Sequence, residues 1–159
     1  TFDVNALAFS VDDRELVAGG ARIAFLGLPD MKETRNLKLP TEYGWNAEHP
    51  NVLDLRFNAD GSVLGAQLDV GIALYDLHTQ QVDAALIKDV TIVGLRFATS
   101  GKIAVFGRQA LYVGPAKLET VKQELHKTEG RFWDVEFRRD DSLLFFGDGI
   151  EGDVEALLE

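Results

Sequence analysis

The chain has 159 residues, of which 46% are hydrophobic and 26% are charged, a composition typical of a folded globular domain. Acidic residues outnumber basic residues by 26 to 16, so the net charge is −10, and the basic residues are scattered, which disfavours nucleic-acid binding. The absence of cysteine excludes disulfides, thiolate metal sites and thiol catalysis.

The first predicted strand ends at Phe9, which opens an internal repeat. Phenylalanine returns at Phe57, Phe97 and Phe137, at intervals of 48, 40 and 40 residues. The residues four and two positions before each phenylalanine are expected to point inward: Asn5 and Leu7, Leu53 and Leu55, Val93 and Leu95, and Trp133 and Val135. This period of two indicates a strand that is buried on one face.

A turn is predicted after each of these strands. The residues three and four positions after the phenylalanines are Asp12-Asp13, Asp60-Gly61, Ser100-Gly101 and Asp140-Asp141. All are residue types that favour turns. Because the carboxylate pairs recur at one place in the repeat, we interpret them as turn residues and not as acid/base catalysts.

Further apolar runs complete each copy. Second and third strands are predicted at 16–21 and 22–28, at 63–68 and 72–77, and at 102–107 and 110–114. A more polar fourth strand is predicted at 35–40, 82–87 and 121–126. The last copy has a second strand at 143–147 and then 153–159, which we interpret as a strand, with a helix as the alternative.

Four antiparallel strands in about 40 residues form one meander, and such meanders must stack to bury their faces. The sequence therefore predicts an all-β fold, a partial β-propeller of about four four-stranded blades with the last one incomplete. The approximate blades are 3–40, 51–88, 90–127 and 130–159, with an insertion at 41–50. A β-sandwich is the alternative.

The second copy resembles a known family. The run VLDLRFNADGSVL followed by IALYDLHTQQV resembles a WD-repeat blade, with Tyr75-Asp76 at the place of the Trp-Asp dipeptide. Leu26-Gly27 and Val113-Gly114 stand there in the first and third copies. The resemblance implies a WD-like propeller segment of about half a ring that acts as a non-enzymatic scaffold for protein–protein interaction.

The insertion TEYGWNAEHP supplies candidate partner contacts. The resemblance implies that this connection faces the side of the ring that often binds partners. Tyr43 and Trp45 are rigid aromatic anchors of the kind that interfaces favour, and His49 lies beside them. The alternative is that these aromatic rings cover the edge of the neighbouring blade.

Three further candidates lie near the hairpins between second and third strands: Arg22, Asp69 and Arg108. The resemblance implies that these hairpins look toward the same face as the insertion. The acidic balance of the chain suggests a protein partner with basic patches, attracted mainly through electrostatic steering.

The fourth copy is short of strands, so both ends of the segment are expected to expose unpaired edges and apolar faces. We expect completion by another copy in a homo-oligomer, by a different subunit, or by the rest of a longer protein. The start at Thr1 instead of methionine also indicates an excised or processed piece.

An enzyme is the alternative function. A propeller-type hydrolase or lyase would gather its catalytic groups at the central channel, and Asp54 and Asp134 on the first strands are the residues to test. We expect no metal and no cofactor, since His49, His78 and His126 lack ligand spacing on one element.

No apolar run reaches the roughly 20 residues of a membrane helix. The N-terminal stretch TFDVNALAFS has neither the basic nor the apolar region of a secretory leader. We therefore expect a soluble, cytoplasmic protein that binds no membrane.

Overall fold

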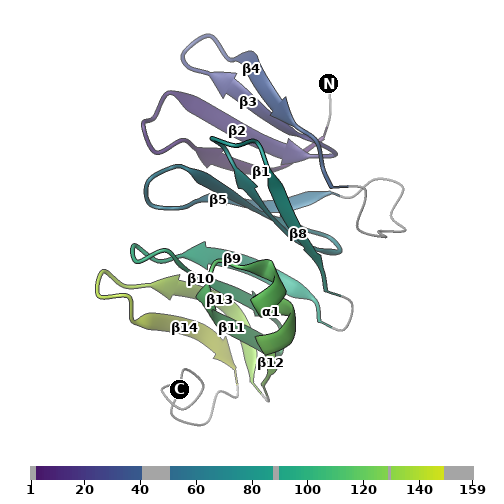
Figure 1. Cartoon of the computed structure of the whole chain (residues 1–159), viewed down its shortest axis with the longest axis vertical. Helices are drawn as coiled ribbons and strands as arrows, with labels where there is room; N and C mark the ends of the chain where they lie inside the picture. Colours follow the sequence, from purple (N-terminus) through teal and green to yellow (C-terminus); the bar gives the residue numbers. More distant parts are fainter. Residues whose placement is uncertain (1–2, 41–50, 88–89, 129, 149–159) are drawn as a thin grey trace.

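The computed structural model describes residues 3–40, 51–87, 90–128 and 130–148. This part of the chain forms four antiparallel sheets and one short helix, which confirms the all-β prediction (Figure 1). The first sheet lies at the top of the view and the second below it, and the third and fourth sheets overlap in the lower part.

Each of the first three sheets is a meander of four strands in the order of the chain. The first sheet contains β1 (Val4–Phe9), β2 (Glu15–Gly20), β3 (Ile23–Gly27) and β4 (Lys32–Leu37). The second contains β5 (Val52–Phe57), β6 (Val63–Leu68), β7 (Gly71–Asp76) and β8 (Val82–Leu86). The third contains β9 (Ile92–Phe97), β10 (Lys102–Gly107), β11 (Ala110–Pro115) and β12 (His126–Lys127), and the fourth contains β13 (Arg131–Phe137) and β14 (Leu143–Asp148).

The four repeated phenylalanines occupy equivalent places in these sheets. Each ends the first strand of its sheet and lies opposite an aliphatic residue of the second strand, in the pairs Phe9–Leu16, Phe57–Leu64, Phe97–Ile103 and Phe137–Leu143. Strand register therefore preserves the repeat that the sequence shows.

The predicted turns are present after all four first strands. The fourth residue of each turn has a positive φ, namely 58° at Asp13, 75° at Gly61, 85° at Gly101 and 62° at Asp141. Its amide donates to the carbonyl three residues earlier, for example Gly61 to Asn58 at 3.1 Å. Glycine and aspartate tolerate this left-handed conformation better than most residues, which explains their recurrence here.

The prediction of strict alternation along the first strands is wrong at one position in each copy, and in the first copy it is also wrong at Leu7, which is 56% exposed. The register skips Asn5, Leu53, Val93 and Trp133, because each first strand carries a β-bulge there. Consequently Trp133 is 59% exposed and Leu53 is exposed, whereas their neighbours Phe132 and Val52 are buried. A bulge adds one residue to the strand and so reverses which side chains face the core.

The predicted fourth strand at 121–126 is also wrong. Residues Leu118–Glu124 form helix α1, and only the two-residue strand β12 pairs with β11. Leu118 and Val121, three residues apart, bury one face of the helix, and all its other positions except Thr120 hold good helix formers. No helix in the described ranges has the length and apolar character needed to cross a bilayer.

The register also moves the expected dipeptide of the third copy by one residue. Tyr75 lies opposite Leu64 and Gly114 lies opposite Ile103, so Gly114-Pro115 is equivalent to Tyr75-Asp76. Tyr75 is buried, which raises the pKa of its phenol, and its hydroxyl donates to the carbonyl of Lys38 at 3.2 Å.

The sheets stack through their first strands. β1 contacts β5, β5 contacts β9, and β9 contacts β13. Each of three apolar clusters joins two successive sheets, the second of them with α1 as well. Between the second and third sheets, the Leu95 side chain lies close to the backbone of Gly65, because a Cβ on Gly65 would lie 2.5 Å from Leu95 Cδ1. At the same junction the buried Gln67 donates from Nε2 to the Ile92 carbonyl at 2.9 Å.

Replacing Gly65 tests this contact. We expect Gly65→Ala to lower the free energy of unfolding by about 1–3 kcal/mol, because the new methyl group overpacks the junction. Leu95→Ala removes the colliding atom, so the two substitutions together should destabilise less than the sum of the single effects. Chemical denaturation of the four proteins measures this coupling, and strict additivity would contradict the contact.

Candidate interaction surface

Apolar side chains of β1 are exposed on the side of the first sheet that points away from the second sheet. Val4, Leu7 and Phe9 are 49%, 56% and 62% exposed. Ala6 and Ala8, which alternate with them, pack into the cluster between the first two sheets. We call the exposed side, with Val4, Leu7, Phe9 and Leu16, the first-sheet outer face.

The equivalent residues of the following sheets are covered. Val52 and Leu55 in β5 are fully buried, as are Leu95 in β9 and Val135 in β13. In each case the cover is the preceding sheet: the cluster around Leu55 includes Val17 and Phe25, and the cluster around Val135 includes Phe106. Among the described residues, no sheet covers Val4, Leu7 and Phe9 on the first-sheet outer face, although the alanines Ala18 and Ala24 on the same side are buried.

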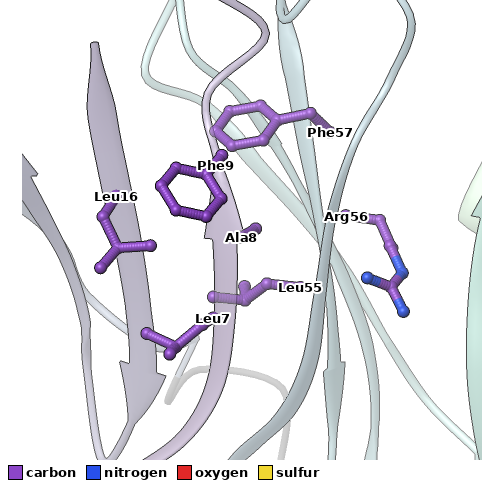
Figure 2. A pocket seen from close by; sticks show the side chains of 7 residues that line it. All are labelled: Leu7, Ala8, Phe9, Leu16, Leu55, Arg56 and Phe57. Carbon is purple, nitrogen blue, oxygen red and sulfur yellow. The ribbon is translucent and has the colours of Figure 1, made fainter. Parts of the chain in front are cut away.

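A hollow of about 460 Å³ lies beside β1. Figure 2 shows its lining, with Leu7 and Phe9 on β1, Leu16 on β2, and Leu55, Arg56 and Phe57 on β5. A second hollow of about 290 Å³ shares Phe57 and is lined by charged side chains that include Glu15, Arg35 and Asp60. The second hollow lies between the first two sheets, because Glu15 and Arg35 are on the same side of the first sheet as Val17 and Phe25.

The fourth sheet exposes apolar side chains on its other side, the side that in the first three sheets faces the next sheet. Leu144 and Phe146 lie opposite Glu136 and Asp134, and Phe146 is 49% exposed. In the first three sheets the residues equivalent to Phe146 are Gly19, Gln67 and Phe106, all of which contact the next sheet or pack into the cluster shared with it. We call Leu144 and Phe146 the fourth-sheet outer face.

An ion-pair ladder joins the first strands of three sheets. Arg96 of β9 is 11% exposed and donates to Asp54 of β5 at 3.2 Å, to Asp134 of β13 at 2.7 Å and to Glu136 at 2.8 Å. Arg56 lies 3.4 Å from Asp54 at the other end of the ladder. The residues that an enzyme would use at the channel, Asp54 and Asp134, are thus both bound to one arginine.

Arg96 is not among the functional residues predicted from the sequence. The signal was the alternation of charge at equivalent positions of the repeat, where Asp54 and Arg56 are followed by Arg96 and then by Asp134 and Glu136. Residues one repeat apart can pair only if the sheets stack on their first strands, so the signal has meaning only once the stacking is known.

Removing Arg96 should weaken the stack. We expect Arg96→Leu to lower the free energy of unfolding by about 1–3 kcal/mol, because it leaves three neighbouring carboxylates without their shared cation. The loss should shrink in high salt, which screens their repulsion. Denaturant titration measures the effect, and Arg138→Leu at an exposed turn is the control; equal losses in the two variants would contradict a role for the ladder.

The hairpin residues predicted from the sequence differ in their surroundings. Arg22 is half-buried and its guanidinium binds both carboxylate oxygens of Glu33, at 2.6 and 2.8 Å. Asp69 and Arg108 are exposed. Their backbone amides donate to the carbonyls of Asn51 and Thr91, which directly precede β5 and β9, the first strands of the same two sheets. Tyr43, Trp45 and His49 lie outside the described residues.

Carboxylates at the opposite end of the sheets hold the turns. The Oδ1 atom of Asp12 accepts from Ser10 Oγ at 2.7 Å, and Asp140 accepts from Ser142 Oγ at 2.6 Å. Asp60 accepts from the Ser62 amide at 2.8 Å. Hydrogen bonds from the serines, with backbone amides, lower the pKa of Asp12, Asp60 and Asp140 below the ordinary value of 3.8.

These turns make stability depend on acid. A carboxyl group whose pKa is lower in the folded chain stabilises the fold above its ordinary pKa, and this contribution is lost as the pH falls through the folded value. We therefore expect the melting temperature to fall as the pH drops below about 4. Asp60→Asn should reduce that dependence, and melting curves from pH 2 to 7 measure it; an unchanged dependence would contradict the turn hydrogen bond.

Within the described ranges, no three histidine, aspartate or glutamate side chains lie close enough together to hold a metal ion. A scan against protein-family models found no match, and a search of curated proteins found no relative.

Proposed function

We propose that the chain is a segment of a WD-like β-propeller and that it acts as a non-enzymatic scaffold for protein–protein interaction. The supporting observation is the stacking of successive meanders through their first strands, which is how the blades of a propeller are arranged. In this proposal the two outer faces are completed by another chain or by the rest of a longer protein.

The proposal assigns partner binding to the hairpin end of the sheets. Backbone hydrogen bonds of Asp69 and Arg108 fix their hairpins beside the starts of β5 and β9, and the Arg108 carbonyl accepts from the Phe132 amide of the next sheet at 3.1 Å. These hairpins therefore form one rigid end that presents exposed charges. The insertion with Tyr43, Trp45 and His49 precedes β5 in the sequence, and the proposal assigns its aromatic residues to partner binding as well.

The charge of the chain suggests the chemistry of the partner. At a net charge of −10 the molecule attracts proteins with basic patches, and such steering accelerates association more than it tightens the final complex. Partner association should accordingly slow as the salt concentration rises.

Affinity capture from the organism that produces this chain tests the hairpin end. We expect Asp69→Lys combined with Arg108→Glu, and separately Trp45→Ala, to reduce retention of specific partners about tenfold. The matched control is Asp30→Lys combined with Lys32→Glu, which swaps an exposed ion pair 3.3 Å apart around the turn before β4.

All variants should keep the melting temperature of the wild type within a few degrees. Equal retention by hairpin variants and control would contradict the assignment of the binding end. An activity toward a small substrate that disappears in Asp54→Asn would favour the enzyme in place of the scaffold.

A further inference from the structure

We propose that a second copy of this chain covers the exposed faces, so that the fourth sheet of each copy packs on the first sheet of the other. This inference rests on the part of the proposed function in which another chain completes the segment, and it specifies that chain. It is independent of which protein binds the hairpin end.

The chain itself shows what covers a first-sheet outer face. At three junctions within one molecule, the side of a sheet that is equivalent to the first-sheet outer face packs against the preceding sheet. The preceding sheet contributes the side that is equivalent to the fourth-sheet outer face. Within its described residues the chain exposes one unpaired surface of each kind, the first-sheet outer face and the fourth-sheet outer face. Two copies arranged about a twofold axis satisfy both surfaces of both molecules through two identical junctions.

The internal junctions indicate which residues meet. A Cβ on Gly19 would contact Val52 and Leu55, so Phe146, which is equivalent to Gly19, is expected to contact Val4 and Leu7 of the other copy. A Cβ on Gly65 would contact Leu95 and Phe97. By the same equivalence, Leu144 is expected to reach Leu7 and Phe9, beside the hollow of Figure 2.

The turns add complementary charge. Between the third and fourth sheets, Thr99 at the second position of its turn donates to Asp141 at the fourth position of the next turn, at 3.0 Å. Between the first two sheets, Val11 and Gly61 occupy these positions, and a Cβ on Gly61 would lie 3.3 Å from Val11 Cγ2, whereas a Cβ on Gly101 between the second and third sheets would meet nothing within 4 Å. In the junction between copies the corresponding residues are Arg139 of the fourth sheet and Asp13 of the first, which are both exposed and of opposite charge.

Molar mass across a dilution series tests the pairing. The wild type is expected at twice 17.5 kDa at micromolar concentration by native mass spectrometry and sedimentation. We expect Leu7→Asp and Phe146→Asp each to raise the dissociation constant about a hundredfold, because one substitution changes both junctions of the dimer. Leu53→Asp is the matched control, since Leu53 is exposed at a bulge and belongs to neither outer face.

Mixing the two variants tests the direction of the contact. In a heterodimer of the two variants, Phe146 of the Leu7→Asp copy meets Leu7 of the Phe146→Asp copy, so one of the two junctions is fully native. The mixture should therefore form a heterodimer more readily than either variant forms a homodimer. A contact between two first sheets predicts instead that Phe146→Asp has no effect. The salt bridge is tested by Arg139→Glu, which should weaken the dimer, with Arg138→Glu as the control at the neighbouring position.

A wild-type monomer of 17.5 kDa at micromolar concentration would overturn the proposal, as would a dimer that tolerates both Leu7→Asp and Phe146→Asp. An open series of larger oligomers would also overturn it, because the two junctions would then not close between two copies. Far-UV circular dichroism and melting curves of every variant show that the fold is retained. None of these three outcomes changes the result expected for partner capture at the hairpin end, so failure of the dimer proposal can be distinguished from failure of the proposed function.

Discussion

Face-to-face packing of successive sheets is the constraint on which this structure depends. A four-stranded antiparallel sheet has two faces, and a sheet with apolar residues on both can bury them only against neighbours. The buried Leu55, Leu95 and Val135 each lie at a junction, whereas the equivalent Leu7 is exposed. Burial in this chain is therefore a property of pairs of sheets and not of single ones.

The junctions share one geometry but differ in chemistry. At one equivalent position, Gly19 lets the backbone approach, Gln67 binds a carbonyl beside the bulge of the next sheet, and Phe106 fills space. Arg96 adds a charged contact that links three sheets. Such differences help each sheet to recognise its own neighbour, since a mispaired junction would leave a buried polar group without its partner.

The two ends of the sheets have different properties. At one end, carboxylates capped by serines hold tight turns that take the left-handed conformation. At the other end, backbone hydrogen bonds anchor hairpins whose charged side chains remain in solvent. A rigid stack with exposed hairpins suits the display of contacts to another molecule, because little conformational freedom is lost on binding.

The sequence by itself determined the local structure: the repeat, the turns, most of the strands and the polar character of the hairpins. These follow from residue type and spacing, since turn residues act through their own backbone and alternation acts within a strand. Only the tertiary structure decided the bulges, the helix at 118–124, the ladder around Arg96 and the exposure of Leu7 and Phe9. These features depend on contacts between residues about 40 positions apart, and no local pattern specifies which sheet covers which face.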